Sequence, residues 1–548
     1  MSRTAIVLAS AALGVACAAA ISLPSRPAPG ATPSWVPSRP VVAGAFHVHT
    51  SRSDGSGSIE EVARAASRAK LAFIVLTDHG DGTRPPLTPV YRSGVLVIDG
   101  VEISTTDGHY AAAGLAPAPY PLAGEGRDVA DDVRRLGGFG VAAHGESPRA
   151  EGQWRDWDAP IDGLEWLNLD ASWRDAPAMT LARGLLTYWL RPAETLASTV
   201  TPPTATLARL DRLAARHRVV ALASADAHGY ALASYDACFR TISTRVELEQ
   251  SLTGDAVADA GAILRALARG RHYTAVDGLA VAPAFEFTAR QGHTSAGEGD
   301  VLPAGQHVTF ESRVVAPPGA VSSLLHDGVV IYRTESSSWH FDTEGNGGAY
   351  RVEVSLAVNA GSTPRPWIVS NPVYVGSGER GPSRATVPEA TPPVSAATPD
   401  APLAWQAEHD GRSQASVDRI EAGVRLRYTL APGAPTNQYA AAAASAPHDL
   451  TRFRGIRLTA RADRPLRISV QLRADRLAGA PCWQRSLYLD TSERTYSIAF
   501  DDMRPVRLAD AARVPLTSIG SLLVLAGLLN GTPASAAEVT VTDFRFEL

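Results

Sequence analysis

Residues 41–50 read Val-Val-Ala-Gly-Ala-Phe-His-Val-His-Thr, an apolar run that ends in two histidines separated by one residue. Such a run predicts a short buried strand. Alternate side chains of an extended strand lie on the same face, so His47 and His49 can reach one ion. The stretch therefore predicts a strand whose carboxyl end carries metal ligands.

Further histidines and carboxylates follow at the ends of other apolar runs, in Ser-Asp-Gly, Leu-Thr-Asp-His-Gly, Gly-Val-Glu-Ile, Ala-Ala-His-Gly and Ala-Asp-Ala-His-Gly. One more histidine, in Gly-His-Tyr, begins a run. A single histidine of this kind is more often structural, but this many in order indicate a multinuclear metal centre. Imidazole and carboxylate together suit zinc, manganese or iron(II) better than calcium or magnesium. The candidate ligands are His47, His49, Asp54, His79, Glu102, His109, His144, Asp226 and His228.

Short apolar strands alternate with helices from residue 41 to about residue 280. This alternation implies a parallel sheet, and ligands at the carboxyl ends of several strands favour a barrel over an open sheet. We expect strands at 41–49, 72–77, 95–103, 109–115, 139–143, 163–167 and 219–224, and helices from residue 58, where Ser58-x-x-Glu61 fits a capping box, and at 127–136, 204–217 and 255–269.

The helical period disappears beyond residue 281. Alternating runs punctuated by Gly, Pro and Asp-Gly predict a small β-sandwich over 281–376. Residues 377–403 are rich in Pro, Ser and Thr and predict a linker, and strands return in 404–548 as a second β-sandwich. Residues 24–40 predict another linker. We therefore expect an α/β barrel at 41–280 followed by two β-sandwich domains.

The first 23 residues have Arg3, then an apolar stretch, then prolines and small residues. This pattern predicts a signal peptide and an exported protein that is periplasmic, secreted or lipid-anchored. Cys17 stands in a sequence similar to a lipoprotein cleavage box, and an uncleaved membrane anchor is the other alternative. The formal net charge of −5 shows no basic footprint, so nucleic acid is not an expected partner.

The ordered motifs between residues 47 and 228 resemble those of the polymerase and histidinol phosphatase (PHP) superfamily of metal-dependent hydrolases. The resemblance covers residues 41–280 and implies a distorted (β/α)7 barrel with two or three divalent ions, manganese, zinc or iron. It implies that His47, His49, Glu102 and Asp226 serve one ion, Glu102, His109 and His144 a second, and Asp54, His79 and His228 a third. Glu102 would bridge two of the ions. Residues 281–376 resemble the β extension of exported members, including a carbaryl-hydrolase-like branch.

We expect a hydrolase in which a metal-activated hydroxide attacks a small-molecule ester, with Glu102 and Asp226 at the reacting centre. A phosphoester is the favoured substrate, and Arg149, five residues past His144, is the candidate contact for its oxygens. A carbamate or carboxylic ester is the alternative substrate. Because residues 404–548 resemble jelly-roll carbohydrate-binding modules, they predict contact with a glycan or the cell envelope, and a non-catalytic glycan-binding protein is a second alternative. The N-terminal segment is the only expected membrane contact.

Overall fold

The computed structural model describes residues 23–24, 33–357, 364–376, 396–397, 403–421, 423–435, 438–447, 449–475, 479–506 and 513–548. The expected signal peptide, including Cys17, lies outside this range except for Leu23. Within the described residues no helix is long and apolar enough to cross a membrane. The chain divides into two compact units, Met1–Ala116 with Val129–Arg384, and Pro117–Asp128 with Ala385–Leu548.

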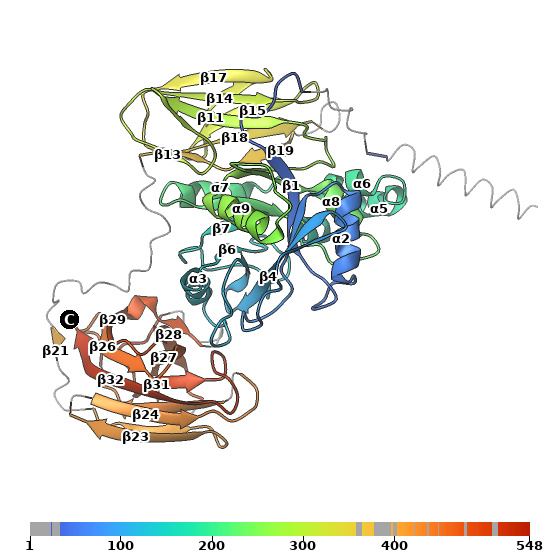
Figure 1. The fold of residues 1–548 in the computed structure, drawn as a ribbon. Helices are drawn as coiled ribbons and strands as arrows, with labels where there is room; N and C mark the ends of the chain where they lie inside the picture. The colour runs from blue at the N-terminus through green and yellow to red at the C-terminus, as the bar shows by residue number, and fades with distance from the viewer. Residues whose placement is uncertain are drawn as a thin grey trace, which may run out of the picture. The chain divides into compact units, whose positions relative to one another are not determined.

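Seven strands of the first unit follow one another around a curled sheet (Figure 1). Neighbouring strands are parallel, except that β5 runs antiparallel to both β4 and β6. The amide of His49 donates to the carbonyl of Ala227 at 3.0 Å, so the chain just after the seventh strand returns to the first. The seven strands are β1 (Val41–Val48), β2 (Phe73–Leu76), β4 (Val95–Thr105), β5 (Gly108–Ala113), β6 (Phe139–Ala142), β7 (Gly163–Asn168) and β8 (Val220–Ser224).

Helices do not follow every strand, so a regular (β/α)7 repeat is absent from the described part of this unit. The chain reverses between β4 and β5 through a tight turn at Thr106 and Asp107, which leaves no room for a helix. A loop without a helix likewise joins β6 to β7, and four successive helices fill the connection from β7 to β8. The helices are α2 (Ile59–Arg68), α3 (Gly126–Arg135), α4 (Leu169–Arg174), α5 (Ala178–Thr187), α6 (Pro192–Thr199), α7 (Thr204–Ala214), α8 (Tyr235–Thr241) and α9 (Ala256–Arg269).

The sequence signals for helix ends are confirmed where they are strongest. Ser58 caps α2 by accepting from the amide of Glu61, whose carboxylate accepts from the amide of Ser58 at 2.8 Å. Asp255 caps α9, and Gly270 ends it with a φ of 75°, a left-handed conformation that glycine adopts without strain.

The β-sandwich of the first unit shares a sheet with the barrel strands. β1 pairs with β9 through its first residues and with β2 through its later ones, and β9 continues through β10 and β19 into the sandwich. A second sheet in the order β12-β11-β14-β17 covers a core that contains Phe285, Phe310 and Trp367. The remaining strands of this unit are β3 (Val90–Arg92), β9 (Ser243–Glu247), β10 (His272–Ala275), β11 (Phe285–Gln291), β12 (Thr294–Ala296), β13 (Val301–Leu302), β14 (Val308–Val314), β15 (Val321–His326), β16 (Val329–Thr334), β17 (Ser338–Thr343), β18 (Gly348–Leu356), β19 (Arg365–Ser370) and β20 (Val373–Val375).

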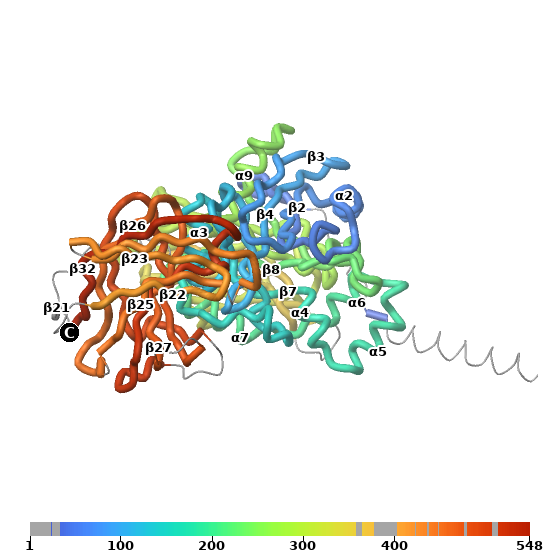
Figure 2. Tube along the Cα trace, turned by 90° about the horizontal axis from the view of Figure 1, so that it is seen from below, coloured from blue at the N-terminus to red at the C-terminus, as the bar shows by residue number. Residues whose placement is uncertain are grey.

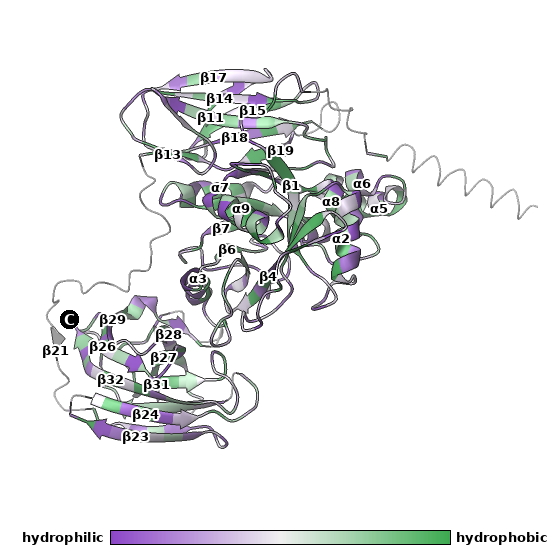
Figure 3. Cartoon of the chain, in the orientation of Figure 1, coloured by the Kyte–Doolittle hydropathy of each residue, from purple (hydrophilic) through white to green (hydrophobic). Residues whose placement is uncertain are grey.

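The second unit is a sandwich of two sheets, with orders β23-β24-β32-β26-β29 and β22-β25-β31-β27-β28-β30. Hydrophilic and hydrophobic residues alternate along several of its strands (Figure 3), because one face of each sheet packs on the shared core. Its strands are β21 (Ala396–Ala397), β22 (Gln406–His409), β23 (Gln414–Ile420), β24 (Gly423–Thr429), β25 (Tyr439–Ser445), β26 (Gly455–Ala462), β27 (Leu466–Arg473), β28 (Cys482–Leu489), β29 (Arg494–Ala499), β30 (Arg504–Pro505), β31 (Ser521–Gly527) and β32 (Ala536–Glu547), with a 3-10 turn, η1 (Phe500–Asp502).

The segment Pro117–Asp128, which includes the first residues of α3, belongs to the second unit, whereas the rest of α3 belongs to the first. The side chain of Asn530 donates to the carbonyl of Pro121 at 3.0 Å, and Arg485 pairs with Glu125 at 3.0 Å and with Asp128 at 2.7 Å. The second unit is therefore not built from residues 404–548 alone.

Candidate metal centre

The structure brings all nine candidate ligands together at the carboxyl ends of the curled sheet. His47 lies in β1, Glu102 in β4 and His109 in β5, whereas His144 follows β6 and Asp226 follows β8. Nitrogen–oxygen distances of 3.7 Å or less link every member of the set to at least one other. Strand ends distant in the sequence therefore converge on one cluster, as parallel topology allows.

Three of these residues have left-handed backbone conformations, with φ of 64° at His47, 47° at His144 and 42° at Asp226. Such values are uncommon for residues other than glycine and concentrate at functional sites. At His47 the pairing of β1 with β2 also shifts register. His47 therefore reaches the cluster through an irregular turn of the backbone and not through the simple strand alternation expected from the sequence.

Glu102 lies at the middle of the cluster and is 1% exposed. One carboxylate oxygen, Oε2, lies 3.3 Å from Nε2 of His47 and 3.2 Å from Nε2 of His49. The other, Oε1, lies 2.9 Å from Nδ1 of His109 and 3.2 Å from Nε2 of His144. The two oxygens thus face two different imidazole pairs, which is the arrangement that a bridging carboxylate requires.

Asp226 completes the group around the first imidazole pair. Its Oδ1 lies 3.4 Å from Nε2 of His47 and 3.3 Å from Nε2 of His49. Its Oδ2 lies 3.3 Å from Nε2 of His144 and accepts a hydrogen bond from the side-chain Nδ2 of Asn168 at 3.1 Å. Asp226 therefore faces three imidazoles at distances of 3.3 to 3.4 Å.

Asp54, His79 and His228 form the outer part of the cluster. The Asp54 side chain is 51% exposed, and its Oδ2 lies 3.3 Å from Nε2 of His228 and 3.6 Å from Nε2 of His79. Nδ1 of His79 faces Glu102 at 3.2 Å. This outer group is more open to solvent than the Glu102 group, so substrate and water can approach it.

Charge complementarity shifts the pKa values of the inner groups. Burial disfavours charged imidazoles, but Asp226 and Glu102 outweigh it and raise the pKa of His49 to about 10. For His144, the same two carboxylates raise the pKa to about 9. Burial would raise the pKa of Glu102, yet His47 and His144 hold it well below its usual range. Without a metal ion the imidazoles keep their protons and so balance the negative charge of the carboxylates. A bound metal ion would replace those protons as the positive charge.

Three buried atoms of the inner group make no hydrogen bond with any described residue: Nε2 of His47, Nε2 of His49 and Oδ1 of Asp226. Buried polar atoms are normally satisfied, so orphans that point at one another indicate a missing partner. Two imidazole nitrogens with carboxylate oxygens are the donor set of a transition-metal site. His47, His49 and Glu102 form one group whose ligand atoms could hold an ion, and further groups include His109, Asp54 and His228. The residues present therefore fit divalent metal ions.

Glu165 positions two of the ligands, a role that the sequence left open. Its Oε1 lies 2.5 Å from Nδ1 of His47, while Oε2 accepts from the amide of His144 at 3.0 Å and from Asn168 at 2.9 Å. A proton held on Nδ1 of His47 leaves Nε2 free to face the cluster. Glu165 therefore sets both the ring orientation and the tautomer of His47.

Asp78, from the same Thr-Asp-His motif as His79, fixes the loop that follows His49. Its Oδ1 accepts from the amide of Thr50 at 2.7 Å, and Oδ2 pairs with Arg52 at 2.6 Å. The sequence motif therefore contains one ligand and one loop anchor.

Two arginines are candidates for an anionic substrate group. Arg149, singled out from the sequence, is exposed, and no described residue forms an ion pair with its guanidinium. Arg174 in α4 lies over the ring of Tyr230, 5.3 Å from its centroid, and Tyr230 stacks on His228 at 5.2 Å. Sequence reasoning missed Arg174 because no ligand motif marks residues 169–199.

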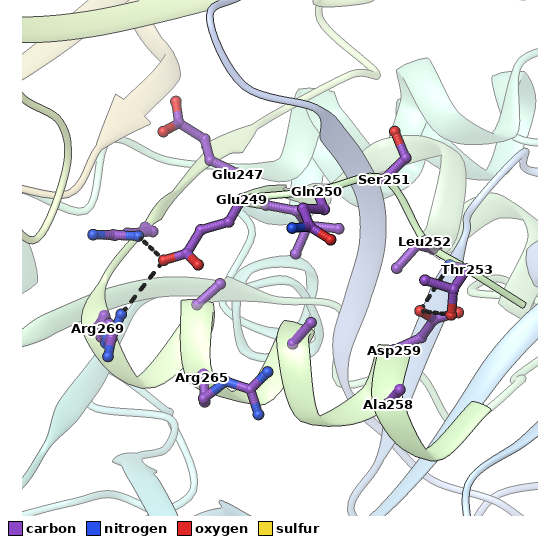
Figure 4. Close-up of a pocket in the computed structure, with 14 residues that line it drawn as sticks. Glu247, Glu249, Gln250, Ser251, Leu252, Thr253, Ala258, Asp259, Arg265 and Arg269 are labelled. Carbon is purple, nitrogen blue, oxygen red and sulfur yellow. Dashed lines mark hydrogen bonds and ion pairs between the residues drawn. The ribbon is translucent and has the colours of Figure 1, made fainter. Parts of the chain in front are cut away.

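A separate cavity of about 480 Å³ lies between α9 and the segment after β9 (Figure 4). Glu249 there pairs with Arg271 at 2.9 Å and with Arg269 at 3.7 Å. Asp259 accepts hydrogen bonds from the amides of Thr253 and Gly254. None of the nine candidate ligands lines this cavity, and its Glu249 already pairs with two of the arginines that line it.

No family model and no curated protein matches the sequence. A two-domain protein from Bacteroides vulgatus that contains a predicted PHP-like metal-dependent phosphoesterase is 14% identical, with a TM-score of 0.29 over 63% of this chain and 99% of that chain. A protein described as a putative metal-dependent phosphoesterase from Bifidobacterium adolescentis is 15% identical, with a TM-score of 0.23 over 37% of this chain and 90% of that chain. The family 11 carbohydrate-binding module of a cellulosomal cellulase from Clostridium thermocellum is 16% identical, with a TM-score of 0.24 over 28% and 95%. What this chain binds and does has to follow from its own side chains.

Proposed function

We propose that this protein is a metal-dependent hydrolase of the PHP superfamily that acts on phosphoesters. The observation that carries the proposal is the group of orphaned ligand atoms on His47, His49 and Asp226, arranged around a Glu102 that faces a second imidazole pair. The two imidazole nitrogens lie 3.3 to 3.4 Å from Oδ1 of Asp226 and yet none of these atoms makes a hydrogen bond with a described residue, whereas a cluster with a structural role alone would normally satisfy them. The donor set supports two or three ions of manganese, zinc or iron.

Divalent ions bound here would supply Lewis acidity toward water and toward the bond that is cleaved. The protein's own groups hold the site in place. Glu102 and Asp226 provide the negative charge that cations need, Glu165 orients His47, and the open side at Asp54 admits the substrate. Arg174, or the exposed Arg149, would contact the outer oxygens of a phosphoryl group.

The positive charge of the metal ions and of a nearby arginine favours a phosphoester as the substrate. A phosphoryl transition state spreads negative charge over several oxygens, and concentrated cations with a nearby guanidinium stabilise it more than they stabilise a neutral carbamate. The carbamate and carboxylic ester alternative uses the same ligands without the guanidinium. Arg174 pairs with Asp170, and neither arginine forms an ion pair with a cluster ligand. The assays below therefore have to distinguish the two reactions.

The proposal includes export and a binding role for the second unit. The apolar sequence before Pro24 supports delivery outside the cytoplasm. The two-sheet architecture of the second unit is compatible with a module that holds a glycan or cell-envelope material close to the enzyme. Affinity of the full chain for insoluble polysaccharide, measured by pull-down, tests this part by itself.

A chromogenic screen with defined metals tests the activity. Metal-stripped protein would be reloaded with manganese, zinc or iron and assayed on aryl phosphate mono- and diesters, aryl esters and aryl carbamates. We expect the highest kcat/KM on a phosphoester, and only with metal present. Better turnover of carbamates would reject the substrate class, and turnover that does not depend on metal would reject the mechanism.

A further inference from the structure

The outer face of α5 and of the turn that follows it is an exposed apolar surface. Of the fifteen large hydrophobic side chains that are exposed in the described residues, five lie between residues 179 and 190. They include Trp189, 72% exposed, and Leu190, 62% exposed. Apolar side chains concentrated in this way mark a binding surface, whereas scattered ones do not. The five are Met179, Leu185, Leu186, Trp189 and Leu190, and we call this set the α5 face.

Buried residues at the end of α5 and in the following turn form hydrogen bonds to the rest of the first unit. Thr187 is buried and bonds the hydroxyl of Thr195 in α6 at 3.0 Å, and the buried Tyr188 accepts from the amide of Ser234 at 3.0 Å. Both views of the molecule place α5 beside α6 at the margin of the first unit (Figures 1 and 2). The apolar side chains therefore point outward from a fixed support.

Within the segment that carries the α5 face the charged side chains are basic, and Asp175 and Glu194 flank it. Residues 176–193 contain no aspartate or glutamate, and their only charged side chains are Arg183 and Arg191. A tryptophan, leucines and a methionine flanked by arginines are the composition of a helix that lies in the interface of a bilayer with anionic lipids.

The N-terminal apolar sequence meets the described structure beside this face. The guanidinium of Arg191, at the end of the same turn, donates to the carbonyl of Pro24. From residue 4 to residue 24 the sequence has no charged residue. Such a composition favours a membrane, and the described Pro24 at its end lies beside the α5 face.

We propose that the α5 face docks on the surface of a lipid bilayer that contains anionic lipids, the same bilayer that receives the N-terminal segment. Trp189 and Leu190 insert among the acyl chains near the headgroups, while Arg183 and Arg191 contact lipid phosphates. The N-terminal segment alone would act as a tether; the α5 face would fix the orientation of the first unit on the membrane. This inference does not depend on the reaction that the metal centre catalyses.

Tryptophan quenching on vesicles tests the docking. The full chain would be reconstituted with vesicles of phosphatidylcholine and phosphatidylglycerol whose acyl chains carry bromine, a contact quencher. We expect quenching in the wild-type protein and loss of the quenched component in Trp189→Phe. Hydrogen exchange of the amides in 178–190 should slow on vesicles, and Leu186→Ser with Leu190→Ser should reduce that protection roughly tenfold or more. The pair Val329→Ser and Val330→Ser, exposed on β16, is the matched control and should change neither signal.

Two results would overturn the proposal. Co-flotation of the protein with vesicles without quenching of Trp189 would show attachment through the N-terminal segment only. Protection of 178–190 that appears without vesicles would show that another surface covers the face: a second copy if it rises with protein concentration, the chain's own N-terminal segment if it does not.

Discussion

Two groups of buried carboxylates in the first unit differ in what faces them. Glu102 and Asp226 lie among imidazoles, which hold the pKa of each carboxyl well below its usual range despite burial. Glu298 is fully buried beside Glu247, and burial together with the neighbouring carboxylate raises its pKa well above the usual range. Arg39 faces this pair, with its Nη1 3.9 Å from Oε2 of Glu247.

The comparison shows that burial of acids does not by itself make a cation site. At Glu298 both oxygens lack a hydrogen bond while the carboxyls are ionised, and one proton shared with Glu247 supplies the missing partner. At Glu102 the facing groups are imidazole nitrogens, which can release their protons to water and then bind a metal ion. The ligand set, and not the depth of burial, therefore separates a metal centre from a protonated acid pair.

The largest expected effect is that of Glu102→Ala. Removing a carboxylate that serves two ions should lower kcat/KM by more than the roughly 10- to 100-fold typical of residues that only support ligands. It should also exceed the effect of His47→Ala, His109→Ala or any other single histidine change. Activity and metal content of the variants check this, with Glu249→Ala in the separate cavity as the control. Equal losses across all ligands would reject the bridging role but leave the site itself standing.

Glu165→Gln should have the next largest effect. The amide cannot replace the carboxylate as acceptor for the protonated Nδ1 of His47 with the same strength, so metal affinity should fall roughly 10- to 100-fold. Competition with a chelator measures that affinity directly, and Glu249→Gln provides a matched control. An unchanged affinity with reduced stability would instead assign Glu165 a purely structural role.

Glu298→Gln should stabilise the first unit at neutral pH by about 1 to 3 kcal/mol, the usual cost of a buried unsatisfied polar group. The folded state raises the pKa of Glu298, so it binds that proton more tightly than the unfolded chain does. The stability that this proton contributes is complete below the pKa of Glu298 in the unfolded chain. It is lost as the pH rises through the pKa of Glu298 in the folded protein. The variant should therefore gain stability at neutral pH and none below about pH 4.

Urea unfolding of the full chain, followed at neutral pH and again below about pH 4, measures this difference in the stability of the first unit. Stabilisation of equal size at both, or a loss at neutral pH, would show that Glu298 is not the protonated member of the pair. Metal content should not change in this variant.

The smallest effect is expected at the arginines. Arg174→Ala should raise KM for a phosphomonoester by about fivefold, the scale of a partly exposed ionic contact, and should leave a neutral aryl ester unaffected. Arg149→Ala, on a more exposed side chain, should change KM less. The reverse order would return the substrate contact to Arg149.

The sequence could predict the ligands because chemistry and position coincide in short motifs. His47 and Asp226 stand at or just after the end of an apolar strand and Glu102 stands in the second half of one, and parallel strands bring such segments together. The backbone irregularity at His47 could not be predicted, since it depends on how β1 meets β2. Helices with clear caps, such as α2 and α9, were predictable for a local reason.

Other features depend on contacts that no local pattern encodes. In the connection between β7 and β8, α5 and α6 have no side-chain cap and no ligand motif marks residues 169–199, so both α5 and Arg174 went unnoticed. The sharing of one sheet between barrel and sandwich follows from the pairing of β10 with β19, strands almost a hundred residues apart. The membership of Pro117–Asp128 in the second unit depends on Arg485 and Asn530, far along the chain.

Elemental analysis of the purified full chain tests the central claim most directly. Purified without chelator, or reloaded with manganese, zinc or iron, the wild-type protein should contain two or three ions per chain, and Glu102→Ala should contain fewer. Unaltered content in Glu298→Gln would show that the loss is specific to the imidazole-lined group. Less than one ion per wild-type chain, with no recovery on reloading, would contradict the account.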